Sequence, residues 1–413
     1  MNYAELSGKS ILLLGKTRSL KYEEFETLLT LHNIVLCRQF EEGVQLIIEG
    51  RLMNPMEQDE SARLYALHAA PIVEIDPLEE WLCRSLEPNR LLMSLKLSRD
   101  QERLVDFIQN PYITDELFFK LLKLYDWQGE GLFDNDSNRD VTAALIGRFY
   151  EDLARNHNVQ YAMSGLAHLV ERYGSAELIS AIAELSPIAR ELKSPNDRSL
   201  NGVLDAIALH GDTPEKILRS LMPQRAGLLA RRVPLSLEEE LLKDEKLHTL
   251  LAQNEALSPQ GSALLEENYG DLIAANIGLD EERFERLLSA YPEALASNPT
   301  LSETMQERLI HTQKEGVLRA LALNPFLTPK WCSYLYDLGG YSVELASNPS
   351  LDSEILATLS HSSDPAILSA LASNTATSIE VLYQLSLDRR FERRVKTNPA
   401  FGKHIQTHNI GWN

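Results

Sequence analysis

A short phrase recurs along the C-terminal half of the chain, and it limits the possible folds more than any other feature of the sequence. Each copy contains an asparagine, the marker residue, and successive markers are 22 to 26 residues apart: Asn254, Asn276, Asn298, Asn324, Asn348, Asn374 and Asn398. Weaker copies place Arg232 and His210 at the marker position, and an outlying copy, "FIQNPYITDEL", places Asn110 there. A period of this length is typical of stacked repeats, in which each unit packs only against its neighbours.

The copy "LASNPSLDSEILATL" indicates how one unit folds. A short apolar helix is expected to end at Asn348, because Pro349 disfavours the helical conformation at the residue before it. Asp352 has a side chain preferred at a helix N-cap, and a second helix with apolar residues at helical spacing follows it. The sequence leaves open whether the marker asparagine closes only its own turn or also hydrogen-bonds the turn of the next layer.

The first 90 residues follow a different pattern, in which short apolar runs alternate with helical segments. The runs "SILLLG", "IVLCRQF", "VQLIIEG" and "PIVEID" predict four buried strands. Strands that alternate with helices indicate a parallel sheet. The predicted fold is therefore mainly α, with three parts: a small α/β domain with a parallel four-stranded sheet at residues 1–90, irregular helical hairpins at 91–200, and an α-solenoid of helical repeats at 201–413.

The repeats at about residues 200–413 resemble the leucine-rich-repeat-variant family, whose units share "NP-x-[ST]P" turns. In the copy "LYQLSLDRRFERRVKTNPAF", the residues at family positions are Asp388, Val395, Asn398 and Pro399. The resemblance implies a right-handed solenoid of short helices. Some family members hold an iron–sulfur cluster on a cysteine-rich segment, but the three cysteines here are far apart: Cys37, Cys83 and Cys332. The sequence therefore predicts no cofactor and no metal site.

The head resembles the BRCT domain, a small α/β module of DNA-damage and replication proteins. The resemblance is carried by Gly8-Lys9 before the first strand, by Gly15 after it, and by "APIVEIDPLEEWLCRS" with its Trp-x-x-x-Ser spacing. Family members that bind phosphopeptides place Ser or Thr before this glycine and Lys in the second helix, whereas this chain has Leu14 and Arg63. Phosphate binding by the head is therefore expected to use backbone N–H groups and a few side chains: Gly15, Lys16, Thr17 and Arg63.

Two Gly-Lys-Ser/Thr triplets, at residues 8–10 and 15–17, lack the other features of a nucleotide-binding phosphate loop. Such a loop needs a glycine five residues before the Gly-Lys pair, where this chain has Tyr3 and Ser10. The residues between Ser10 and the second triplet are apolar and belong to a strand, so they cannot wrap a phosphate. No pairing of a nucleophile with a base is evident, and the sequence predicts that the protein is not an enzyme.

The chain carries 60 acidic and 40 basic residues, and its net charge of −20 disfavours general binding to nucleic acids or anionic membranes. One basic cluster nevertheless forms a candidate nucleic-acid contact near the C-terminus: Arg389, Arg390, Arg393, Arg394 and Lys396. A second cluster comprises Lys216, Arg219, Arg225, Arg231 and Arg232. Two interpretations stay open, since the arginine stems either cover the end of the stack or line up as a basic stripe.

These patterns predict a cytoplasmic, non-enzymatic scaffold that uses its repeats as an extended surface for a protein partner. The alternative is a DNA-binding or DNA-repair-associated protein, in which the BRCT-like head and an arginine-rich stripe contact nucleic acid. No membrane association is expected, because no stretch approaches the about 20 apolar residues that span a bilayer. The identity of the partner and the oligomeric state do not follow from the sequence.

Overall fold

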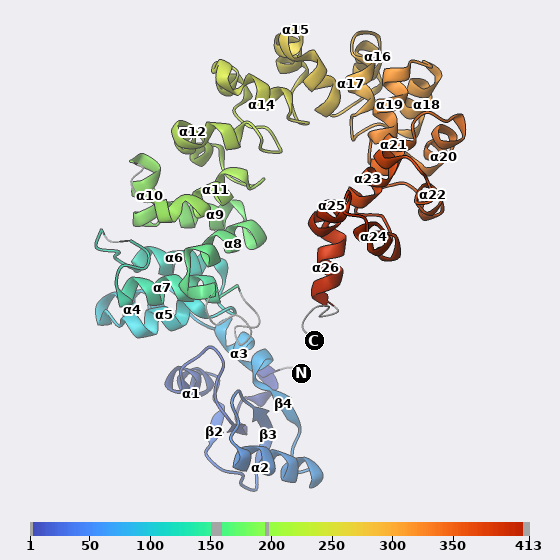
Figure 1. Ribbon diagram of the computed structural model, residues 1–413. Helices are drawn as coiled ribbons and strands as arrows, with labels where there is room; N and C mark the ends of the chain where they lie inside the picture. The colour runs from blue at the N-terminus through green and yellow to red at the C-terminus, as the bar shows by residue number, and fades with distance from the viewer. Residues whose placement is uncertain (1–2, 130, 150–158, 195–197, 408–413) are drawn as a thin grey trace. The chain divides into compact units, whose positions relative to one another are not determined.

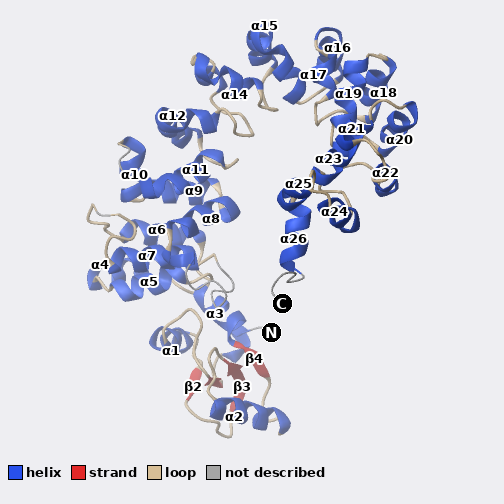
Figure 2. Cartoon of the chain, in the orientation of Figure 1, coloured by secondary structure: helices blue, strands red, loops and turns tan. Residues whose placement is uncertain are grey.

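The computed structural model describes residues 3–129, 131–149, 159–194 and 198–407. The predicted fold class is confirmed, because a small parallel four-stranded sheet at the N-terminus is followed by a long helical region (Figure 1, Figure 2). The chain divides into two compact units, Met1–Arg225 and Ala226–Asn413. The domain boundaries expected at residues 90 and 200 stay predictions.

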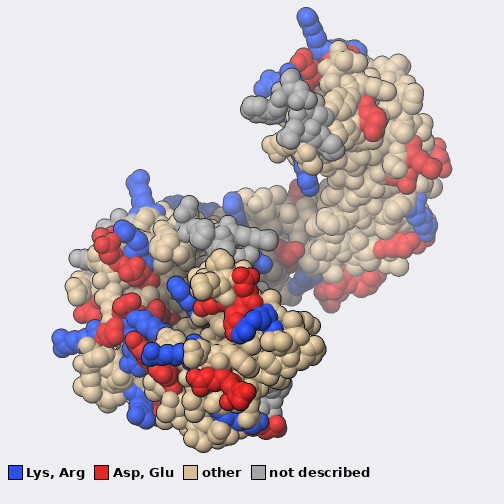
Figure 3. All heavy atoms as spheres, turned by 90° about the horizontal axis from the view of Figure 1, so that it is seen from below, with Lys and Arg blue, Asp and Glu red and all other residues tan. Residues whose placement is uncertain are grey.

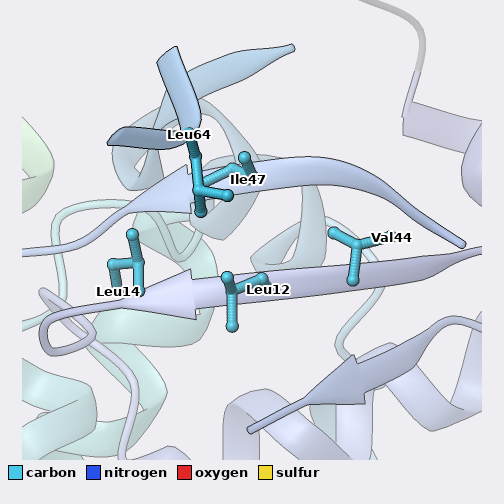
Figure 4. Packing of buried hydrophobic residues seen from close by; sticks show 5 residues of the cluster. All are labelled: Leu12, Leu14, Val44, Ile47 and Leu64. Carbon is cyan, nitrogen blue, oxygen red and sulfur yellow. The ribbon is translucent and has the colours of Figure 1, made fainter. Parts of the chain in front are cut away.

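The sheet has the strand order β2-β1-β3-β4, and every neighbouring pair of strands is parallel. Its elements are β1 (Ser10–Leu14), α1 (Tyr22–Leu31), β2 (Val35–Cys37), β3 (Val44–Glu49), α2 (Pro55–Ala66), β4 (Ile72–Glu74) and α3 (Ile75–Cys83). Leu64 of α2 packs on one face of the sheet against side chains from β1 and β3: Leu12, Leu14, Val44 and Ile47 (Figure 4). Because side chains alternate along a strand, Ile11 and Ile48 lie buried on the opposite face.

Helices continue from the head through the rest of the first unit. They are α4 (Pro88–Ser98), α5 (Gln101–Gln109), α6 (Asp115–Leu124), α7 (Asp136–Gly147), α8 (Met163–Tyr173), α9 (Ala176–Glu184), α10 (Ser186–Lys193), α11 (Asn201–Leu209) and α12 (Glu215–Leu229), which bends at Arg225. Asn110 Nδ2 donates to Cys83 Sγ of α3 at 3.4 Å. Arg18 Nη1 donates to Tyr112 Oη at 3.1 Å. The head therefore packs directly on the first helices.

The second unit consists of short helices in pairs. They are α13 (Glu238–Leu241), α14 (His248–Ala252), α15 (Pro259–Asn276), α16 (Glu281–Ala290), α17 (Pro292–Ala296), α18 (Glu303–His311), α19 (Glu315–Leu323), α20 (Pro329–Leu338), α21 (Ser342–Ser347), α22 (Ser353–Leu359), α23 (Pro365–Ser373), α24 (Ile379–Ser386), α25 (Glu392–Thr397) and α26 (Pro399–Thr407). The expected N-caps form: Ser302 and Asp352, for example, accept hydrogen bonds from backbone N–H groups of the following helix.

The marker asparagines link each layer of the second unit to the layer before it. Nδ2 of Asn348 donates to the C=O groups of Asn324 and Ala322 at 2.8 and 2.9 Å, and its Oδ1 accepts from the N–H of Ser350 at 2.8 Å. The same three hydrogen bonds recur at equivalent atoms in four other layers, at Asn254, Asn324, Asn374 and Asn398. The marker therefore both closes its own turn and bonds a neighbouring layer, which is the preceding one.

The marker predicted at Asn276 is wrong by one residue. Asn276 lies in the last turn of α15 and its Nδ2 donates to Leu272 C=O four residues earlier at 2.7 Å. Ile277 ends the helix with an extended backbone, and its C=O accepts from Asn298 Nδ2 at 2.9 Å. Ile277 therefore has the marker position, but its side chain cannot donate a hydrogen bond to the layer before it. At His210, by contrast, ring Nδ1 accepts from the N–H of Asp212 at 3.1 Å, as the asparagine Oδ1 does.

Replacing Asn348 by alanine should lower the free energy of unfolding by about 3 kcal/mol, because the buried Ala322 C=O and the Ser350 N–H lose this partner and the Asn324 C=O loses one of two. Asn298→Ala should have a similar effect. Asn276→Ala is the matched control, since that side chain bonds only within its own helix, and its effect should stay below about 0.5 kcal/mol. Urea unfolding followed by circular dichroism measures all three, and equal stability of Asn348→Ala and the parent would contradict this account.

Candidate functional site

The turn after β1 brings three of the four residues of the predicted phosphate site together. Gly15, Lys16 and Thr17 line a cavity of about 460 Å³, together with Tyr22 and Asp106 among others. Arg63 is not among the lining residues; it lies on α2 and pairs with Glu60 of the same helix at 2.6 Å. Arg63 does not line this cavity, and its part in anion binding stays a prediction.

The backbone of this turn is already engaged by the fold. Lys16 N–H donates to Arg51 C=O at 2.7 Å, and Arg51 N–H donates back to Lys16 C=O at 2.6 Å. Gly15 has φ +89°, and an added Cβ would lie 2.8 Å from Arg51 O, so only glycine fits there. The Lys16 N–H group is thus unavailable to phosphate. The side chains of Lys16 and Thr17 stay exposed or half-exposed at the cavity, and anion binding there remains a prediction.

A buried carboxylate of the head occupies the backbone N–H groups that come next. Glu79 of α3 is fully buried and accepts from the N–H groups of Arg18, Ser19 and Leu20 at 3.1, 3.0 and 3.4 Å. Burial raises the pKa of the Glu79 carboxyl, and the three backbone donors act in the opposite direction. Three converging N–H groups form an anion-binding nest, and here the protein's own side chain fills it.

The role of Glu79 did not follow from the sequence analysis, although one signal was present. Glu79 stands in "PLEEWLC" at helical spacing with Ile75, Leu78 and Leu82, all of which are buried. A charged residue within an apolar helical stripe is rarely buried without partners, so it indicates a specific hydrogen-bonding role.

The C-terminal basic cluster separates into three kinds of residue. Arg390 is paired with Asp388 and Lys396 with Glu392, at 2.7 and 2.6 Å. Lys396 also stands where other layers bury an alanine two residues before the marker, as at Ala346 and Ala372. The remaining residues are exposed and have no carboxylate partner within the described residues: Arg389, Arg393 and Arg394. The position of Lys396 fits the interpretation in which basic side chains cover the end of the stack. The positions of the three arginines do not distinguish this interpretation from a basic stripe.

Two residues of the second basic cluster are paired with carboxylates, and a third is buried. Arg219 pairs with Glu215 at 2.5 Å, and Arg225 pairs with Asp205 at 2.5 Å. Arg232 is buried and its Nη1 donates to Pro234 C=O and Ser236 Oγ at 2.5 and 2.8 Å. Basic and acidic side chains are likewise interspersed over much of the face drawn in Figure 3. Lys216 and Arg231 are exposed, so within the described residues the pairing covers only part of the second cluster.

One helix from each pair in the second unit lies in a continuous row. Helices α17, α19, α21, α23 and α25 each contact the next, while α18, α20, α22 and α24 lie outside this row (Figure 1). We define the inner face as the exposed side chains of this row. One position of it, immediately before each marker, is exposed in every layer: Ser297, Leu323, Ser347, Ser373 and Thr397.

Removing the Glu79 carboxylate should release the turn after β1. Glu79→Ala leaves three backbone N–H groups without an acceptor, so the free energy of unfolding should fall by about 3 kcal/mol. Hydrogen exchange should also accelerate at the amides of Arg18, Ser19 and Leu20. The neighbouring Glu80→Ala is the control, because Glu80 is half-exposed and pairs only with Arg84; its effect should stay below about 1 kcal/mol. Unchanged exchange in Glu79→Ala would refute the assigned role.

Comparisons with known proteins add no assignment to these surfaces. No protein-family model matches the chain, and no curated protein is significantly similar to it in sequence. Among the residues that the structure describes, no group of three or more His, Cys, Asp or Glu side chains is arranged to hold a metal ion. No helix within those residues is long and apolar enough to cross a membrane.

Proposed function

We propose that this protein is a non-enzymatic scaffold that binds a protein partner along the inner face of its helical array. The observation that carries the proposal is the recurrence of the asparagine hydrogen bonds at Asn298, Asn324, Asn348, Asn374 and Asn398. They fix successive helices of the row in one register, so equivalent side chains form a continuous surface. A surface that is ordered before binding costs less conformational entropy when a partner binds.

The chemistry of the inner face suits an extended protein segment. Three of the five residues before the markers are serines, and a fourth is Thr397. The positions four residues before the markers add small side chains in several layers, at Ala294, Ala320 and Ala370. Small side chains let a partner's backbone approach closely, and serine hydroxyls supply hydrogen bonds along it. Such a surface favours an extended chain over a small molecule, which needs a concave pocket.

The two family resemblances belong to this proposal. The array would be a right-handed solenoid of the leucine-rich-repeat-variant type, and the head would be a BRCT-like domain of a protein that works in the cytoplasm. The parallel sheet of the head and the layer-by-layer repeat of the second unit support these assignments.

The alternative function, binding of nucleic acid, has one observation in its favour. Arg389, Arg393 and Arg394 lack carboxylate partners within the described residues. A protein that binds DNA through its backbone typically contacts about 6–10 phosphates, more than three guanidinium groups supply. We therefore place this alternative second.

A bulky side chain on the inner face should block the partner, while the same change on the outer helices should not. Ser347 and Ser333 form a matched pair, because each is exposed and each hydroxyl donates at 3.1 Å to the C=O four residues earlier in its own helix. Ser347 lies in α21 of the inner row, and Ser333 lies in α20 outside it. Affinity purification from the native cell should therefore recover the partner with Ser333→Trp and lose most of it with Ser347→Trp.

The comparison is valid only for variants that fold, so both should melt within a few degrees of the parent, as is usual for exposed substitutions. Recovery of the same partners with Ser347→Trp as with the parent protein would rule out the inner face as the binding surface. A chain without residues 1–90 tests in addition whether the head contributes to partner binding.

A further inference from the structure

The last layer of the array carries an excess of positive charge that no other described layer of the second unit shares. Residues 388–396 contain five basic and two acidic side chains. The four preceding arginines of the second unit, from residue 283 onward, are all ion-paired: Arg283, Arg286, Arg308 and Arg319. In the last layer the two carboxylates, Asp388 and Glu392, are taken by Arg390 and Lys396.

Two of the remaining arginines lie on the inner face. Arg394 and Arg393 precede the marker Asn398 by four and five residues, the positions of Ala370 and Ser369 in the layer before. Arg394 Nη1 lies 3.5 Å from Ser373 Oγ, which places this guanidinium beside the exposed end of α23. The inner face of α23 is uncharged, with alanine and serine at its exposed positions, so it supplies no carboxylate to either arginine.

We propose that Arg393 and Arg394 bind an acidic segment of the protein partner, rich in Asp or Glu, at the end of the inner face. This inference rests on the proposed scaffold function and names the chemistry of the partner. A guanidinium presents a planar pair of N–H donors that matches a carboxylate, which makes arginine better suited than lysine to such a contact. The uncharged inner face next to Arg394 accommodates the neutral residues that adjoin the acidic ones.

The small size of the charged region favours a peptide over a nucleic acid as the ligand. Residues 389–394 extend over a few turns of chain at most, and two or three guanidiniums match two or three carboxylates. A duplex would extend beyond this region across a protein with a net charge of −20, where its phosphates would be repelled. A short acidic segment of a protein avoids this repulsion.

A binding titration with the full chain tests the inference. The probe is a short fluorescein-labelled peptide of alternating Glu and Ser residues, followed by fluorescence anisotropy, and the same peptide with Gln in place of Glu is the uncharged counterpart. The Glu peptide should bind and the Gln peptide should not. The double variant Arg393→Ala/Arg394→Ala should weaken binding by about tenfold, and added salt should weaken binding to the parent protein.

Two further variants separate the effect of the paired guanidinium N–H donors on binding from the effect of positive charge. Lys243→Ala/Lys246→Ala removes two exposed cations elsewhere in the second unit and should leave the Kd unchanged. Arg393→Lys/Arg394→Lys keeps the charge but loses the paired donors, so its Kd should lie between those of the parent and the double alanine variant.

Three results would overturn the inference: no binding of the Glu peptide, equal binding by the double alanine variant, or tighter Arg393/Arg394-dependent binding of a single-stranded oligonucleotide than of the peptide. None of them decides the scaffold function, which depends on the Ser347→Trp comparison. Conversely, recovery of the same partners with Ser347→Trp would rule out the inner face as the scaffold's binding surface even if the peptide binds.

Discussion

The buried amide of the marker asparagine is the interaction on which the array depends. Its two N–H groups and its oxygen all find backbone partners, and six of these residues are at most 4% exposed: Asn254, Asn298, Asn324, Asn348, Asn374 and Asn398. Burying the amide with any of these bonds missing would cost free energy. The asparagine therefore permits only the alignment in which the turns of neighbouring layers meet. The apolar faces of the helices drive stacking without selecting a register, whereas the asparagine selects one.

Layers without an asparagine show what the position requires. In the first unit, the buried Arg148 donates through its guanidinium to the C=O groups of Asn110 and Ile113, so it bridges to a marker turn as an asparagine amide does later in the chain. Nδ1 of His210 reproduces the acceptor of the asparagine, and Ile277 offers its backbone C=O. A donor aimed at the carbonyls of the adjacent helix exit thus recurs in both units, and asparagine and arginine side chains can each supply it.

Sequence reasoning found the features that are local in the chain and missed those that depend on tertiary contacts. The helix end at Asn348 and the N-cap at Asp352 follow from neighbouring residues, and both form as predicted. Asn276 misled the assignment because α15 continues one residue further than the phrase suggests. Local spacing does not show which way the face of α2 that carries Arg63 is directed. It also does not show that Glu79 contacts the turn after β1, since the two are 60 residues apart in sequence.

The layer with unpaired arginines is the one at which the series of marker asparagines ends. The C=O of Asn398 accepts from Gly402 N–H at 2.9 Å within α26, and no marker asparagine follows it within the described residues. Lys396 replaces the alanine against which another layer packs elsewhere in the unit. Along the array, a neighbouring layer can supply the carboxylate for an arginine, as Glu344 does for Arg319 at 3.2 Å. The adjoining helix of the row, α23, has no charged side chain, and no carboxylate of the described residues pairs with Arg393 or Arg394, so their positive charge is available to a partner.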